Sequence, residues 1–227
     1  MARLALMVAL AAGLTLVAGA DASISPSQSA IDAAVKAAGS FHYVSNTISQ
    51  SGNVLHMDAD SATSRGIQRI TFTKGGQSGH VTVVVEANTA YVKGDQFALL
   101  NYLLFPQTAA TAFAGKWLRL EPSSKAFASV AAEVRIDHWT YESITLPANA
   151  HTVGAATIDG RHAIRLEGQA TQNGVTLTQD LYVAAKGAPL PIAETYKQGK
   201  RIVGSVQFTK WHEGVANMAP ASSILLP

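Results

Sequence analysis

The 227-residue chain contains no cysteine, which excludes a disulfide framework, a thiolate nucleophile, a cysteine-ligated metal and covalent haem attachment. Charge is also scarce, because Lys, Arg, Asp and Glu make up only 14% of the chain and give a formal net charge of +2. Such weak and scattered charge does not predict nucleic-acid binding. After residue 17 no apolar run approaches the length of about 20 residues that crosses a bilayer. We therefore expect no membrane-spanning helix beyond the N-terminal segment.

The first residues have the layout of a secretory signal peptide. Arg3 supplies a positive start, residues 4–17 form an apolar run, and small residues follow up to Ala22. We expect cleavage near Ala20 or Ala22, which makes the mature chain secreted or otherwise extracytoplasmic in the cell envelope. Residues 16–20 also have the form of a bacterial lipoprotein signal, except that Ala20 stands where the lipidated cysteine would be. No lipid anchor is expected, because an acyl group has no thiol to attach to.

The rest of the chain has the composition of one folded domain. Apolar residues make up 48% of the sequence, which is enough for a substantial core. The length corresponds to one sizeable domain, and no linker, charge block or low-complexity segment divides it. We expect a signal peptide over residues 1–22, a single domain over residues 23–218 and a flexible tail over residues 219–227.

The hydrophobic period predicts a short helix followed by strands. Ser25 and Gln28 have the spacing of a capping box with Pro26 at the first helical position, and Gly39 ends the apolar helical pattern. Beyond Gly39 the period changes to two, which is typical of antiparallel strands with one solvated face. The strands are expected over residues 41–49, 54–60, 67–73, 80–86 and 89–93, and again over residues 153–158, 162–167, 175–184, 192–197 and 201–211.

Helices are expected between these two groups of strands. Asp95 can cap an apolar helix over residues 97–105, and a second helical stretch covers residues 108–114. A further helix begins after Ser123 or Ser124 and runs to about Val134, with one apolar stripe. The predicted fold class is therefore α+β, with two antiparallel meanders and a few short helices.

Motifs that would supply catalysis or hold a cofactor are missing from the sequence. The seven histidines show neither H-x-H nor H-E-x-x-H spacing, so no zinc site is indicated. The nucleophile motif G-x-S-x-G and the glycine-rich phosphate-binding motifs do not occur. We expect no metal, no cofactor and no enzymatic activity, and we keep a hydrolase built from scattered His and Glu side chains as a third hypothesis.

Apolar side chains are more abundant around residues 97–105 than one sheet-packing helix needs. The helices are short and rich in alanine, so they leave space over the apolar face of the strands. A hydrophobic cavity between strands and helices is the expected result, since ligand pockets are concave and mostly apolar. Strand and helix parity gives its expected lining as Ile70, Phe72, Val83, Val85, Phe97, Leu100, Leu104, Phe113, Phe127, Val130, Ile164, Leu166, Leu181 and Val183.

Several short segments carry a family resemblance over about residues 27–220. They are residues 90–94, 116–117, 153–154, 157–163, 181–184, 187–191, 208–211 and 219–220. In these segments the chain resembles the LolA-like superfamily, and within it the LppX/LprG-type lipoproteins of actinobacteria. The resemblance implies a curved antiparallel half-barrel wrapped over helices and enclosing a hydrophobic cavity. It also implies transport of lipids, lipoproteins or acylated glycolipids without shared catalytic residues.

The leading hypothesis is a secreted, non-enzymatic carrier that binds a lipid or another acylated molecule for transport across or within the cell envelope. We expect a monomer, with transient contact to a membrane surface and no nucleic-acid partner. The alternative is an envelope sensor or protein-interaction module with a closed core and a protein partner in the envelope. Trp139, Tyr141 and the loop around Phe105 would then be the candidate contacts.

Overall fold

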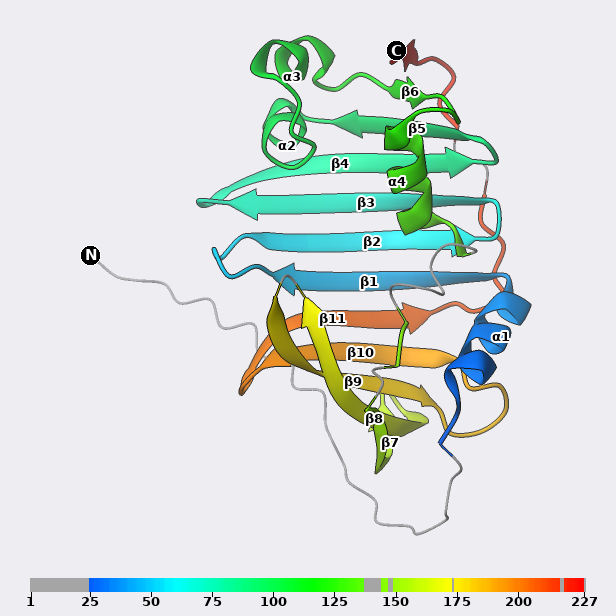
Figure 1. Cartoon of the computed structure of the whole chain (residues 1–227). Helices are drawn as coiled ribbons and strands as arrows, with labels where there is room; N and C mark the ends of the chain where they lie inside the picture. Colours follow the sequence, from blue (N-terminus) through cyan, green and yellow to red (C-terminus); the bar gives the residue numbers. More distant parts are fainter. Residues whose placement is uncertain (1–24, 137–143, 147–148, 173, 217–218, 227) are drawn as a thin grey trace.

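The computed structural model describes residues 25–136, 144–146, 149–172, 174–216 and 219–226. Within these residues a 12-stranded sheet is accompanied by short helices (Figure 1). The elements in chain order are α1 (Gln28–Ala38), β1 (Ser40–Ile48), β2 (Val54–Ala62), β3 (Arg65–Lys74), β4 (Gln77–Glu86), β5 (Thr89–Gly94), α2 (Gln96–Asn101), α3 (Gln107–Phe113), β6 (Leu118–Leu120), α4 (Lys125–Val134), β7 (His151–Ile158), β8 (Arg161–Gln172), β9 (Val175–Ala184), β10 (Pro191–Gln198), β11 (Arg201–Thr209) and β12 (Ile224–Leu225).

The sheet joins the two predicted meanders side by side. Its strand order is β12-β6-β5-β4-β3-β2-β1-β11-β10-β9-β8-β7, with every neighbouring pair antiparallel except β12 and β6. The junction is the pairing of β1 with β11, in which Tyr43 lies opposite Phe208. We call β1–β6 the first arm and β7–β11 the second arm. The predicted α+β class and its antiparallel meanders are confirmed.

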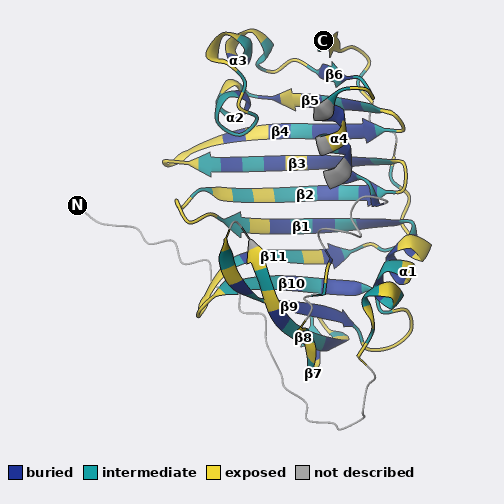
Figure 2. Cartoon of the chain, in the orientation of Figure 1, coloured by how far each residue is buried: buried dark blue, intermediate teal, exposed yellow. Residues whose placement is uncertain are grey.

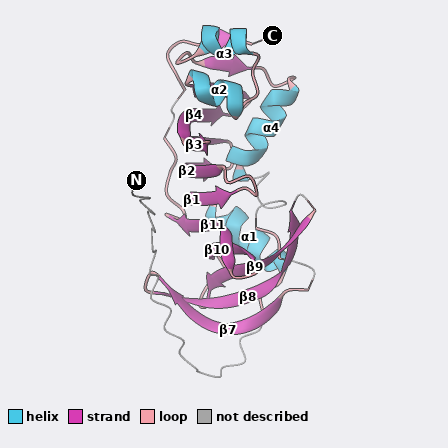
Figure 3. Ribbon diagram, turned by 90° about the vertical axis from the view of Figure 1, so that its left-hand side faces the viewer, coloured by secondary structure: helices cyan, strands magenta, loops and turns pink. Residues whose placement is uncertain are grey.

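The second arm curls strongly because its strands contain irregularities. Register shifts occur at Thr152/Gly154, at Pro191/Ala193 and at Tyr196/Lys197, and such bulges bend a strand and increase its twist. Figure 3 shows β7, β8 and β9 sweeping toward the side of the sheet on which α1 and α4 lie. The sheet therefore has a concave face, and that face holds the core.

Two apolar clusters fill most of the concave face (Figure 2). One cluster joins α1 to the junction and the second arm, and Ile31, Val35 and Phe41 are among its buried members. The other joins α4 to β3, β4 and β5. The end of α4 approaches β3 so closely that a Cβ on Gly66 would lie 2.6 Å from Val134 Cγ1 and 2.6 Å from the Asp60 carbonyl oxygen. Glycine is therefore required at this contact.

Two local predictions, the start of α1 and the end of α2, need correction. The N-cap of α1 is Ser27, whose side chain accepts from the Ala30 N–H, so the helix begins two residues later than the Ser25 capping box predicts. Helix α2 ends at Asn101 instead of residue 105. Within the predicted flexible tail, Ile224 and Leu225 pair in parallel with Leu118 and Arg119 of β6. No helix in the described part of the chain is long and apolar enough to cross a membrane.

Candidate functional site

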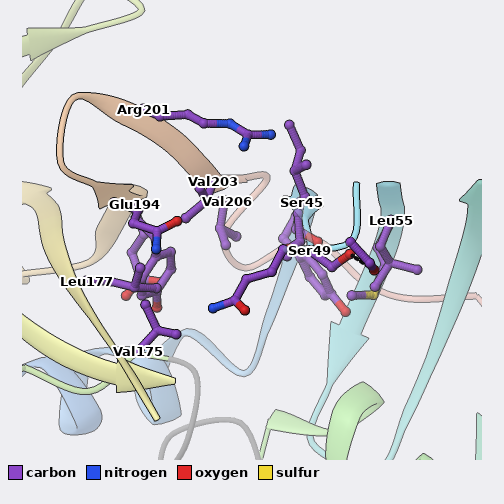
Figure 4. Close-up of a pocket in the computed structure, with 18 of the residues that line it drawn as sticks. Ser45, Ser49, Leu55, Val175, Leu177, Glu194, Arg201, Val203 and Val206 are labelled. Atoms are coloured by element: carbon purple, nitrogen blue, oxygen red, sulfur yellow. Dashed lines mark hydrogen bonds between the residues drawn. The ribbon is translucent and has the colours of Figure 1, made fainter. Parts of the chain in front are cut away.

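A pocket of about 810 Å³ opens on the concave face where the two arms meet (Figure 4). Strands β1, β2 and β3 supply one wall, and β9, β10 and β11 supply the other. The lining residues are Tyr43, Ser45, Thr47, Ile48, Ser49, Gln50, Ser51, Leu55, Met57, Gln68, Tyr102, Val175, Leu177, Glu194, Tyr196, Gln198, Arg201, Val203, Gly204 and Val206. A volume of this size lies within the range of about 300–1,000 Å³ that is usual for small-molecule sites.

The cross-strand register explains why these side chains face one another. Ser45 lies opposite Val206, and Thr47 lies opposite Gly204. On the next strand Glu194 lies opposite Val206. Alternation along each strand sends every second side chain to the same face, so all of these residues point to the concave side. Curling of the second arm then brings Val175 and Leu177 over them.

The pocket combines aliphatic walls with uncharged polar groups. Leu55 and Met57 on one arm face Leu177, Val203 and Val206 on the other. Serine, threonine, glutamine and tyrosine side chains make up most of the remaining lining, and only Glu194 and Arg201 in that lining are acidic or basic. Figure 4 shows Arg201 extending from β11 toward the side on which Ser45 lies. This distribution suits a largely apolar molecule with a few polar atoms.

Glu194 is the most unusual group in the pocket. Its side chain is 0% exposed, and burial raises the pKa of its carboxyl group to about 8. Two hydrogen bonds oppose that rise, since Gln179 Nε2 donates to Glu194 Oε1 at 3.2 Å and the Tyr196 hydroxyl donates to Oε2 at 3.1 Å. Burial and the neighbouring carboxyl group in turn raise the pKa of Tyr196. At neutral pH Glu194 is therefore mostly a neutral acid, which suits a pocket for apolar ligands.

Ser45 is a second buried polar residue of the pocket wall. The residue is 6% exposed, and within the described part of the chain its hydroxyl has no hydrogen-bond partner. A buried hydroxyl without a partner is costly and uncommon. Nearby, Gln68 Nε2 donates to the Tyr43 hydroxyl at 2.5 Å, both side chains being buried. The pocket wall at the junction therefore contains polar groups that lie beneath its accessible surface.

A charged cluster on the opposite side of β9 holds the second wall in place. Asp180 is fully buried and accepts from Arg165 Nη2 at 2.9 Å and from Lys197 Nζ at 2.5 Å. Burial alone would raise the pKa of Asp180, but the hydrogen bonds from Lys197 and Arg165 outweigh it and lower that pKa. The cluster ties β8, β9 and β10 together behind Glu194.

The residues that we expected to line a cavity all lie in the described part of the chain, and none of them lines this pocket. Strand parity is as predicted, since Ile70 lies opposite Val81 and Phe72 opposite Gly79 on the concave face. That face is filled by the two core clusters, which contain or contact Ile70, Val83, Val85, Phe127, Val130, Ile164, Leu166, Leu181 and Val183.

The remaining expected residues lie around α2 and α3. Phe72 stacks on Phe97 at 6.3 Å between ring centroids, and Phe97 and Leu100 line a second hollow of about 420 Å³. Phe113 meets Phe105 edge to face at 6.5 Å. Leu104 is 78% exposed, because α2 ends before it. Trp139 and Tyr141 lie outside the described residues.

The described histidines occupy separate positions. On the convex face His42 contacts Asp60 at 2.8 Å, His56 contacts Asn46 at 2.8 Å, and His80 contacts Thr71 at 3.2 Å. No group of three or more potential ligands among the described His, Asp and Glu residues could hold a metal ion. The acidic residue of the pocket lining is Glu194, which periodicity alone did not single out. Its signal in the sequence was an acidic residue at an inward position of β10.

Comparison with known proteins gives structural similarity only. No protein-family model matches the chain, and no curated protein matches it. Among solved structures, the chain is similar to the Mycobacterium tuberculosis lipoprotein LppX, with a TM-score of 0.45, 15% identity and coverage of 83% of this chain and 94% of LppX. An uncharacterized conserved protein from Thermus thermophilus gives a TM-score of 0.44 at 10% identity, over 87% of this chain and 94% of that one.

The chain is also similar to MucB, solved in complex with MucA(peri), with a TM-score of 0.38 and 13% identity. That match covers 85% of this chain but 58% of MucB, so the chain spans less than two thirds of its length. LppX is among the lipoproteins that the sequence segments resemble. At these identities the likeness concerns the fold alone, and a function has to come from the side chains of the site.

Proposed function

We propose that this chain is a secreted, non-enzymatic carrier that binds a lipid or another acylated molecule in the pocket between its two arms. The observation that carries the proposal is the 810 Å³ pocket with facing aliphatic walls. Each methylene group moved from water into such surroundings contributes about 0.8 kcal/mol. An acyl chain can therefore bind without any charged or catalytic partner, because its binding rests on apolar contact.

Native mass spectrometry of the mature protein, secreted from a bacterial host and purified without detergent, tests this function. We expect an adduct that extracts into chloroform and is identified as a lipid. A bare protein mass that persists after incubation with phospholipids would overturn the carrier function. That result would favour the alternative, an envelope sensor or protein-interaction module.

A pair of adjacent residues on β11 provides matched variants for the location of the ligand. Val203 lines the pocket. The register shift at Tyr196/Lys197 places Ile202 opposite Lys197 on the other face, where it is 53% exposed. Val203→Trp should weaken binding of a fluorescent fatty acid by about tenfold or more, because a larger side chain overfills the site. Ile202→Trp should leave binding unchanged. Equal affinities for both variants would remove the ligand from this pocket.

We also propose that residues 1–22 direct export and are then removed. The support is the charge, apolar run and small residues of that segment, which lies outside the described part of the chain. The mass of the secreted protein in the same spectrum shows whether this segment has been removed. A mature protein that begins at Asp21 or Ser23 is expected, and an uncleaved chain in the secreted fraction would contradict the proposal.

A further inference from the structure

Strand polarity gathers several turns at one end of the sheet. In antiparallel pairs every second turn lies at the same end, and the end pairs Ile48–Val54, Lys74–Gln77 and Gln198–Arg201 mark these turns. Strand β5 also ends there and leads into α2 and α3 (Figure 1). We call the turns at residues 49–53, 75–76 and 199–200, together with residues 95–117, the α2 end. The pocket reaches it through residues 48–51, Gln198 and Arg201.

The α2 end is basic. Lys74, Lys200 and Arg201 are exposed there, and the described turns at residues 49–53, 75–76 and 199–200 contain no Asp or Glu. Residues 96–117 add the exposed Lys116 without any acidic residue.

Asp95 is the acidic residue that begins the α2 segment, and its carboxylate is engaged. Oδ2 accepts from the His80 N–H at 2.6 Å and Oδ1 accepts from the Ala98 N–H at 2.8 Å. At the opposite end of the sheet charges of both signs lie together, since Arg65 pairs with Glu86 at 3.4 Å and Arg161 begins β8 close to Asp159. The α2 end instead carries Lys74, Lys116, Lys200 and Arg201 against the single carboxylate of Asp95, so its net charge is positive.

The same end exposes large apolar side chains. Leu104 is 78% exposed, Ile202 is 53% exposed and Val54 is 37% exposed. Leu104 also has a φ of 58°, a left-handed conformation that is unfavourable for leucine. The fold thus holds an apolar side chain in solvent at a conformational cost, two residues before Pro106 and in the segment that joins α2 to α3.

From this combination we infer that the α2 end docks on an anionic lipid bilayer, with Leu104 entering the interface and the basic side chains facing lipid phosphates. The basic turn and the apolar tip lie together, because Lys74 Nζ donates to Asn101 Oδ1 of α2 at 3.3 Å. Trp117 stacks under Lys93 at 5.8 Å next to this end, and tryptophan is suited to the bilayer interface. Tyr102, two residues before Leu104, lines the pocket. Docking therefore brings the pocket close to the membrane.

Co-sedimentation of the mature protein with vesicles tests the inference. We expect binding to vesicles of equal parts phosphatidylglycerol and phosphatidylcholine, much weaker binding to pure phosphatidylcholine, and loss of binding as salt rises and screens charge. Leu104→Asn should lower the partition coefficient about tenfold or more. Asparagine tolerates a positive φ, so this variant keeps the fold. Absence of binding to the anionic vesicles would overturn the inference.

Matched variants test whether vesicle binding depends on the α2 end itself or only on the total charge and the exposed apolar side chains of the protein. The double variant Lys74→Gln, Lys200→Gln should weaken binding about fivefold for each charge removed. The double variant Lys36→Gln, Lys186→Gln changes net charge equally through exposed residues outside the α2 end, and should bind as the wild type does. Leu225→Asn, at a side chain 49% exposed on β12, is the control for Leu104. Equal losses of vesicle binding in controls and test variants would contradict the assignment of docking to the α2 end. The ligand content of the pocket is measured separately, by native mass spectrometry, so the two proposals can fail independently.

Discussion

The buried carboxyl group of Glu194 makes stability depend on pH in a direction opposite to that of an ordinary paired carboxylate. Its pKa rises from 4.5 to about 8 because folding removes it from water. Between these values the folded state holds a proton that the unfolded state has released. The contribution of Glu194 to stability is therefore greatest at and below about pH 4.5. It falls as pH rises toward 8 and does not change further above that pH.

The size of this effect follows from the pKa change. Each pKa unit corresponds to about 1.4 kcal/mol, so the contribution of Glu194 should fall by about 4 kcal/mol between pH 5 and pH 8. The side chain is 0% exposed, so solvent does not screen the cost of ionising it. For a domain with a total stability of about 5–15 kcal/mol this is a large share.

Glu194→Gln isolates the effect, because the amide is close in size to the carboxyl group and cannot ionise. Its oxygen can still accept from Gln179 Nε2, as Glu194 Oε1 does. Urea unfolding should be measured for both proteins at pH 5, 6, 7 and 8. We expect the free energy of unfolding of the variant, relative to wild type, to increase by about 4 kcal/mol over this range. The two proteins are otherwise identical, so every other pH-dependent contribution cancels in the difference.

Glu213→Gln provides the control, since this exposed side chain is solvated whether the chain is folded or not. Its profile should run parallel to that of the wild type. If the Glu194→Gln profile is also parallel, Glu194 is ionised in the folded protein. The account of a neutral acid in the pocket would then be wrong.

Two further predictions concern the walls of the pocket and the core. Gly66→Ala should destabilise the fold by about 2 kcal/mol in urea unfolding, because the new Cβ would meet the Asp60 carbonyl and Val134 at 2.6 Å; unchanged stability would show that α4 is not packed on β3. Asp180→Asn should cost about 3 kcal/mol near pH 7, because it leaves Arg165 and Lys197 without their buried carboxylate. The pKa of Asp180 is lowered on folding, so this stabilisation is present above its ordinary value of 3.8 and is lost as pH falls below it. Equal stabilities of the two proteins at pH 7 would refute the role of the cluster.

The sequence predicts the elements of this fold better than the location of its pocket. Alternation along β3 and β4 correctly assigns Ile70, Phe72, Val83 and Val85 to one face, because side-chain direction in a strand is a local property. The pocket instead depends on the pairing of β1 with β11, which joins residues more than 150 positions apart. It also depends on bulges that curl the second arm. No local pattern contains these features.

The same distinction explains why the expected lining became core. Apolar residues at inward positions indicate a surface that must be covered, but they do not say by what. Helix α4 and the α1 cluster cover most of that surface. The space that remains lies beside the polar inward residues Ser45, Gln68 and Glu194, which are expensive to bury against a closed apolar core. Polar residues at inward strand positions are thus the better guide to an open site in this fold.

The proposed ligand site and the proposed docking surface share one end of the molecule and the side chain of Arg201, but their main apolar contacts come from different residues. Val203 faces the pocket and does not need the bilayer, whereas Leu104 faces solvent at the tip between α2 and α3. Val203→Trp should therefore lose the fatty acid and keep binding to anionic vesicles, and Leu104→Asn should do the reverse. If either variant loses both properties while its unfolding curve stays that of the wild type, the pocket and the tip act as one site. Tyr102, which belongs to both regions, would then be the side chain that couples them.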